Sequence, residues 1–302
     1  MTDVPKSNDL LARFACLFAG ALWGLFWIPL RAIAETGIHG LWAPLIWFGV
    51  PTCCLIPVII WRWRQIMAGG FSLQITAFMA GLALTLYTFS FIYTEVVRAM
   101  LLFYLTPVWS TILARLILGD AITGLRLLAM SLAIAGMLII FGLGLNFPIP
   151  KNIGDWLGLA SGIVWAIAAV RLRQSDKYAA IDLTCGFFGW SMLVALIACL
   201  TLLPESTPSA DQIIPLLYWM VPIVVLLVLP GAFASLWGPK FVSPGLASLL
   251  MMTEIIFGSI TAALFANEPF GLREITGVLL IASASLIEPL HDFTSRDTRN
   301  AA

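Results

Sequence analysis

Charged residues and histidines are scarce in this sequence. Only 11% of the 302 residues are charged, the 16 basic side chains are balanced by 16 acidic ones, and there are two histidines. A nucleic-acid-binding surface needs an excess of Lys and Arg, so this balance argues against nucleic acid as a partner. With so few metal-binding side chains we expect no metal site, and no motif indicates a cofactor.

The five cysteines lack the spacing of a disulfide framework or a zinc site. All of them lie inside apolar stretches, with no CxxC or Cys–His pattern. We interpret them as small packing residues. They are Cys16, Cys53, Cys54, Cys185 and Cys199.

The residues of a membrane enzyme or a channel are also missing. An intramembrane enzyme would need a nucleophile with a base, paired aspartates or a histidine cluster, and the apolar stretches contain none of these. A channel would need a repeated filter or a ring of charges, for which one intramembrane carboxylate is poor evidence. A channel therefore stays the weaker alternative to a carrier.

Apolar residues are what the chain has in excess. They make up 61% of the sequence, and the mean hydropathy of +0.99 is far above that of a soluble globular chain. Because lipid offers the backbone no hydrogen-bond partners, each apolar stretch of about 20 residues should be a helix that crosses the bilayer. The sequence thus predicts an all-α membrane protein with ten transmembrane helices. The ten stretches are 13–34, 42–61, 73–93, 97–118, 124–142, 154–173, 183–203, 216–238, 244–266 and 272–289.

The distribution of Lys and Arg predicts the orientation. With the N-terminus in the cytoplasm, twelve basic residues lie on the cytoplasmic side and four (Arg31, Arg98, Lys151 and Arg273) on the other. This asymmetry follows the positive-inside rule. Ten crossings then place both termini in the cytoplasm.

An internal repeat appears when the sequence is aligned with itself at an offset near 145. Gly20 and Trp23 in the first stretch match Gly162 and Trp165 in the sixth, and the fourth stretch aligns with the ninth without a gap. The repeat predicts one five-helix unit at 14–142 and a second at 154–289. Because five is odd, the second unit must enter the membrane from the opposite side, so the repeats are inverted, as in many secondary transporters.

Several of these segments resemble a known family. They are Ala21-Leu22-Trp23-Gly24, Tyr104-Leu105-Thr106-Pro107-Val108, Leu118-Gly119-Asp120 and Asn267-Glu268-Pro269. In this order they resemble the drug/metabolite transporter superfamily, in its ten-helix form with two EamA-type units, over residues 14 to 289. More narrowly, the chain is similar to bacterial inner-membrane exporters of aromatic amino acids.

The resemblance implies export from the cytoplasm through a cavity between the two halves, with aromatic amino acids or similar amphipathic metabolites as cargo. It also implies a bacterial inner-membrane location. This sequence departs from the family at Asp120, where Glu is usual, and at Ile255, where the repeat alignment would place a proline equivalent to Pro107. Because of Ile255 we expect the two halves to hinge unequally, whereas Asp120 should change little.

Glu254 is the most unusual residue for its position, with about seven apolar residues on either side of it in the ninth stretch. A carboxylate at that depth costs several kcal/mol unless it faces a polar interior. It would either bind the ammonium of a substrate or carry a proton that is exchanged for substrate. The alternative is a protonated Glu254 that only joins helices through a hydrogen bond.

Aromatic and polar side chains supply the other candidates for substrate binding. Trp23 and Trp165 are repeat-equivalent, Trp27 shares the helix face of Trp23, and a cavity role competes with aromatic packing. Either a wet cavity or helix contacts explain the hydroxyl-rich third stretch, and Pro107 would kink the fourth. The remaining candidates are Tyr87, Thr88, Phe103, Tyr104, Trp237 and Met251.

The substrate class follows from the basic residues, which lie near helix ends. A carrier of phosphorylated compounds would place Lys or Arg deep in its cavity. We therefore expect a secondary exporter of aromatic or other amino acids, with cationic drugs or quaternary compounds as the alternative cargo. Gly158 and Gly162 form a GxxxG pair that we expect to seat a helix of the same monomer, although a second subunit would also fit.

Overall fold

A computed structural model describes residues 6–38, 40–94, 96–141, 149–174, 177–202, 207–265 and 270–300. Within these ranges the regular structure is entirely helical and no strand occurs, which confirms the all-α prediction. The Asn267-Glu268-Pro269 segment lies outside the described residues.

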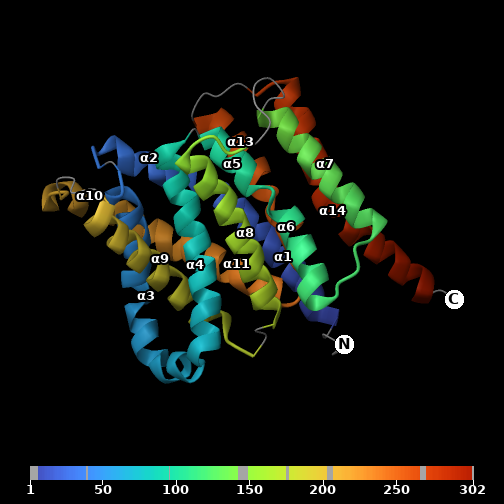
Figure 1. Cartoon of the computed structure of the whole chain (residues 1–302), viewed down its shortest axis with the longest axis horizontal. Helices are drawn as coiled ribbons and strands as arrows, with labels where there is room; N and C mark the ends of the chain where they lie inside the picture. Colours follow the sequence, from blue (N-terminus) through green and yellow to red (C-terminus); the bar gives the residue numbers. More distant parts are fainter. Residues whose placement is uncertain are drawn as a thin grey trace.

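The helical elements follow the ten predicted stretches in order (Figure 1). The predicted first unit contains α1 (Lys6–Trp23), α2 (Trp27–Glu35), α3 (Trp42–Ala68), α4 (Gly70–Tyr93), α5 (Val96–Phe103), α6 (Thr106–Leu113), η1 (Ala114–Leu118) and α7 (Gly124–Phe141). The predicted second unit contains α8 (Ile153–Gln174), α9 (Ala180–Leu202), α10 (Ala210–Ile223), η2 (Val224–Val228), α11 (Leu229–Trp237), η3 (Gly238–Lys240), α12 (Pro244–Met251), α13 (Thr253–Phe265) and α14 (Leu272–Asn300).

Eight helical segments of the described chain are long and apolar enough to cross a membrane, and a ninth, Gly124–Ile140, is shorter. The tenth predicted stretch forms the first part of α14, where Arg273, Glu274 and Glu288 interrupt the apolar run. Several helices are longer than the apolar stretch from which they were predicted. A transmembrane helix can extend beyond the hydrocarbon core into the headgroup region and the water.

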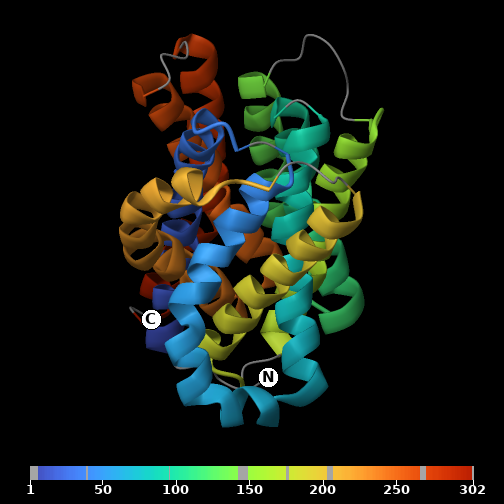
Figure 2. The same ribbon diagram turned by 90° about the vertical axis from the view of Figure 1, so that its left-hand side faces the viewer.

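The ends of the helices show how the chain is threaded. The first residues of α1, the last residues of α14 and the α3–α4 turn lie toward the same end of the molecule in both views (Figures 1 and 2). Helices α7 and α14 pack side by side along one flank, while α3, α4 and α9 form the other. The shared end of the termini agrees with an even number of crossings. Which end faces the cytoplasm stays a prediction.

Equivalent glycines make equivalent contacts in the two repeats. Gly20 of α1 packs against the backbone of Met251, where α12 ends, and Gly162 of α8 packs against the backbone of Phe103, where α5 ends. Small residues at such crossings let two helix backbones approach closely. Gly158 packs on Ala99 of α5, so the GxxxG pair contacts a helix of the same chain, as expected.

We expect Gly20→Ala to destabilise the protein by about 1 to 3 kcal/mol, because overpacking a close contact forces the backbone to shift. The added Cβ would lie 2.5 Å from the Met251 carbonyl oxygen and 2.2 Å from the Thr253 hydroxyl. Gly189→Ala is the matched control, since its Cβ would have no neighbour within 4 Å. Thermal unfolding in detergent checks the prediction, and equal midpoints for the two variants would contradict it.

Three of the membrane segments, the first, the fourth and the ninth, are broken near their middle. The fourth breaks between Phe103 and Thr106, where Pro107 lacks an N–H and the Thr106 hydroxyl donates to the Phe103 carbonyl instead. The ninth breaks at Met252, which aligns with Tyr104, although Ile255 is no proline. There the Thr253 hydroxyl lies 2.9 Å from the Leu17 carbonyl oxygen and 3.0 Å from that of Leu250.

The fourth and ninth segments thus break at aligned positions, although only the fourth has a proline there. Unequal hinging of the two halves stays a prediction. The first and sixth segments differ in their backbone. The turn at residues 24–26 separates α1 from α2, whereas the equivalent α8 is continuous. Non-helical backbone at membrane depth is tolerated where it is buried in protein or lines a cavity.

Candidate functional site

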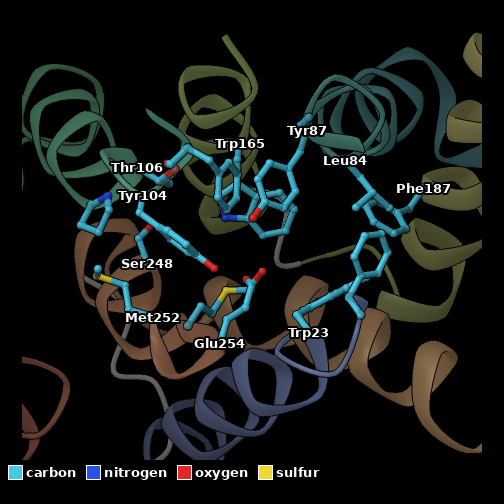
Figure 3. Close-up of a pocket in the computed structure, with 15 residues that line it drawn as sticks. Trp23, Leu84, Tyr87, Tyr104, Thr106, Trp165, Phe187, Ser248, Met252 and Glu254 are labelled. Carbon is cyan, nitrogen blue, oxygen red and sulfur yellow. The ribbon is translucent and has the colours of Figure 1, made fainter. Parts of the chain in front are cut away.

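The three helix breaks surround one central cavity (Figure 3). Its free space of about 60 Å³ has room for a few water molecules. Side chains from both repeats line it, and most of them are aromatic or carry sulfur. They are Trp23, Phe26, Ala83, Leu84, Tyr87, Phe103, Tyr104, Thr106, Pro107, Trp165, Phe187, Ser248, Met251, Met252 and Glu254.

Glu254 is the carboxylic acid in the lining of this cavity. It lies in the first turn of α13, directly after the break at Met252, and its carboxyl group points toward the hydroxyls of Tyr87 and Tyr104. Among the described residues it makes no ion pair, and no Lys, Arg or His lines the cavity. The N-terminal end of α13 also favours a negative charge at this position. The cavity therefore presents one carboxylate with no cation of the protein beside it.

The hydroxyls of Tyr87 and Tyr104 are buried and aimed at the same space. Tyr87 is 5% exposed and Tyr104 is 3% exposed. The two hydroxyls lie within reach of each other, and that of Tyr104 also lies within reach of the Glu254 carboxyl group, but none of these contacts has the geometry of a good hydrogen bond. Both lie close enough to Glu254 to interact with its charge. Hydrogen bonds weaken steeply when they are poorly aligned. A water molecule or a polar ligand in the cavity would therefore give both hydroxyls better partners.

Aromatic rings form the walls. Tyr87 and Phe103 stack with ring centroids 4.3 Å apart, and Phe103 meets Tyr104 edge-on at 5.4 Å. The indole N–H of Trp23 donates to the Ser235 hydroxyl at 2.7 Å, which fixes this ring against α11. The indole nitrogen of Trp165 points toward the cavity (Figure 3). Such surfaces can stack on a planar ligand or attract a cationic one.

Most of the predicted site residues lie together around this cavity. Those that line it are Trp23, Tyr87, Phe103, Tyr104, Pro107, Trp165, Met251 and Glu254. They come from the first, third, fourth, sixth and ninth membrane segments. Their role in substrate binding stays a prediction.

Three predicted residues do not line the cavity. Trp27 begins α2 and donates its indole N–H to the Thr261 hydroxyl at 3.1 Å, because the turn at residues 24–26 takes it off the helix face of Trp23. The Thr88 hydroxyl donates to the Leu84 carbonyl of its own helix at 2.9 Å. Trp237 packs on Phe241 at 4.9 Å, at the end of α11.

Seven lining residues were not predicted from the sequence. Thr106 had a usable signal, because it aligns with Glu254 in the repeat, and Ser248 is a polar residue in an apolar stretch. Apolar residues such as Phe187 have no distinguishing signal in a chain with 19 phenylalanines. The others are Phe26, Ala83, Leu84 and Met252.

Three basic residues lie near apolar stretches, and any of them inside the cavity would contradict the expectation that it lacks Lys and Arg. None of the three lines it. Arg31 is exposed and pairs with Glu35. Arg115 is exposed and donates to the Gly119 carbonyl, and the buried Lys240 donates to the Tyr178 carbonyl. In the described part of the chain, no group of three or more His, Cys, Asp or Glu side chains is arranged to hold a metal ion.

Comparison with known proteins relates the second unit to a transporter family. Residues 152–287 match the EamA-like transporter family, which supports the resemblance to the drug/metabolite transporter superfamily and indicates a membrane transporter rather than an enzyme. No curated protein matches the chain.

A solved structure shares the fold. Its title reads only "Crystal structure of protein", and it superposes with a TM-score of 0.72 at 14% sequence identity, over 95% of this chain and 98% of the other. At this identity the likeness concerns the fold alone.

Proposed function

We propose that this chain, with its EamA-like second unit, is a secondary transporter that exports aromatic or other amino acids and similar amphipathic molecules from the cytoplasm. The observation that carries the proposal is Glu254, a carboxylate that faces an aromatic cavity containing no basic side chain. Such a cavity suits a small molecule with one cationic nitrogen and an apolar body. We place the protein in a bacterial inner membrane with both termini in the cytoplasm.

Each part of an aromatic amino acid has a suitable group in the cavity. The ammonium would pair with Glu254 among the rings of Tyr87, Phe103 and Trp165, and the apolar side chain would lie against the aromatic wall of the cavity. The carboxylate would accept hydrogen bonds from the hydroxyls of Tyr87 and Tyr104, which point into the cavity. The cavity of about 60 Å³ must widen to admit such a molecule, since ligand pockets usually exceed about 300 Å³.

The broken helices provide the means for that change. Rigid half-helices joined at the breaks of the fourth and ninth segments can tilt about the cavity, which alternately opens it to each side of the membrane. Because the breaks lie at Phe103–Thr106 and at Met252, both hinges are adjacent to the proposed binding site.

Uptake of labelled phenylalanine and tryptophan into proteoliposomes tests the proposal. We expect saturable, protein-dependent uptake of both, and none of glutamate, whose second carboxylate would face Glu254. Uptake by protein-free liposomes is the control. If neither aromatic amino acid enters faster than in the control, amino acid transport is refuted.

Export of organic cations is the second candidate, because the cavity offers no basic side chain to meet a substrate carboxylate. Phenethylamine, which is phenylalanine without its carboxylate, separates the two candidates. A strong preference for phenethylamine favours the cation exporter, and a preference for phenylalanine favours the amino acid exporter. Linear, unsaturable flux of either compound would indicate a channel.

A further inference from the structure

A second hollow lies beside the central cavity, between the first, second and eighth membrane segments. It has a volume of about 210 Å³, and no charged side chain lines it. We call it the lateral groove. Its lining consists of Leu22, Trp23, Leu25, Phe26, Ile28, Pro29, Trp47, Ile223, Leu227, Val228 and Gly231.

The lateral groove and the central cavity share a wall made of Trp23 and Phe26. These two rings lie 5.5 Å apart, and Phe26 also meets Trp47 edge-on at 5.1 Å. The two residues that the linings share are thus both aromatic. Because the hydrogen bond to Ser235 holds Trp23, rotation of the Phe26 side chain would join the two spaces without moving a whole helix.

Irregular backbone borders the groove on both sides. The turn at residues 24–26 separates α1 from α2 on one side, and the π-helical segment η2 (Val224–Val228) lies on the other. π-helical turns are rare and occur frequently at functional sites. Gly231 adds space, because a side chain there would press against Leu22.

The two spaces differ in the size of the group that each can hold. A central cavity of about 60 Å³ holds Glu254 but not an aromatic ring as well, whereas a groove of about 210 Å³ exceeds the roughly 150 Å³ that suffices to bind benzene in an apolar cavity. The two spaces are also adjacent. A Cβ added to Gly24, which follows Trp23, would lie 2.6 Å from the backbone oxygen of Glu254.

We propose that the lateral groove is the subsite for the apolar ring of an amphipathic amine whose ammonium is bound at Glu254. The inference rests on the proposed function, because it takes Glu254 as the ammonium site. Phe26 turns aside when the ring enters, and the groove determines which side-chain sizes the transporter accepts. A substrate with a small side chain occupies the central cavity alone.

Neighbouring leucines provide a matched pair of variants. Leu227 lines the groove and is 38% exposed, whereas Leu226 does not line it and is 70% exposed. Leu227→Trp fills the groove from its rim, and Leu226→Trp adds the same ring on the outer surface. Both positions tolerate a large side chain better than a core position does.

Inhibition constants of phenethylammonium and propylammonium, measured against labelled phenethylammonium on the purified protein, test the proposal. Leu227→Trp is expected to raise the inhibition constant of phenethylammonium about tenfold, because its ring loses the free energy of burial in the groove. The inhibition constant of propylammonium should rise less than twofold. Leu226→Trp should change neither constant.

Three results would overturn the proposal. The inhibition constant of phenethylammonium on Leu227→Trp stays within twofold of the wild-type value, the constants of both amines rise by the same factor, or Leu227→Trp and Leu226→Trp give the same constants. Glu254→Gln separates this failure from that of the proposed function. Binding that depends on Glu254 but not on Leu227 refutes the groove alone, whereas binding that does not depend on Glu254 refutes both.

Discussion

Glu254→Gln is expected to lower kcat/KM for export by about 30-fold or more. Truncating one partner of a desolvated charge pair costs about 2 to 5 kcal/mol, and here the substrate ammonium loses its counter-charge inside a cavity that has no other carboxylate. Gln keeps the size of the side chain and a hydrogen-bond acceptor for the tyrosines. The change therefore removes the charge with little effect on packing.

Initial rates of uptake into proteoliposomes measure this loss, with Glu35→Gln as the control. Glu35 is an exposed carboxylate that pairs with Arg31 at a helix end, so its neutralisation should leave the rate within twofold. Transport by Glu254→Gln at the wild-type rate would contradict both proposed roles of Glu254, ammonium binding and proton exchange.

A second readout separates these two roles. If Glu254 binds the ammonium, the Gln variant loses both gradient-driven uptake and exchange of labelled for unlabelled substrate. If it only carries the exchanged proton, exchange persists in the variant while uphill uptake driven by a proton gradient stops. Wild-type uptake that is indifferent to the gradient would count against proton coupling.

Hydropathy predicted the helical segments because the bilayer imposes one rule on the whole backbone, namely that every polar group must be bonded within the segment. It did not predict the breaks. Pro107 signalled one of them, but the break at Met252 depends on the Thr253 hydroxyl reaching the Leu17 carbonyl of a helix far away in sequence. Tertiary contacts of that kind leave no trace in a hydropathy pattern.

In the candidate site, too, the sequence indicated some residues, and others depend on the tertiary structure. Glu254 and the repeat-equivalent Trp23 and Trp165 were identified because an intramembrane carboxylate is costly and because the repeat marks the symmetry axis. Trp27 does not share the face of Trp23, because spacing by four residues implies a shared face only on a continuous helix and α1 ends at Trp23. Thr88 lies outside the cavity lining with its hydroxyl bonded to its own helix, which a sequence pattern does not show.

A buried ion pair that joins the two repeats was not predicted from the sequence. Asp155, in the first turn of α8, is fully buried and pairs with Arg98 of α5. It also accepts hydrogen bonds from the Thr94 hydroxyl at 2.7 Å and from the backbone N–H of Lys151 at 2.8 Å. This network fixes the start of the second unit to the third and fourth membrane segments of the first.

Asp155→Ala is therefore expected to destabilise the protein by about 3 to 5 kcal/mol, because it leaves the buried donors around this site without their carboxylate. The midpoint of thermal unfolding should fall by roughly 5 to 10 °C. A thiol-reactive dye can follow unfolding in detergent, since Cys16, Cys185 and Cys199 are buried. Asp211→Ala is the control, because Asp211 also lies in the first turn of a helix but is exposed. Equal shifts for the two variants would show that Asp155 acts only through the helix dipole, while a larger shift at Asp155 identifies the network as the clamp between the two repeats.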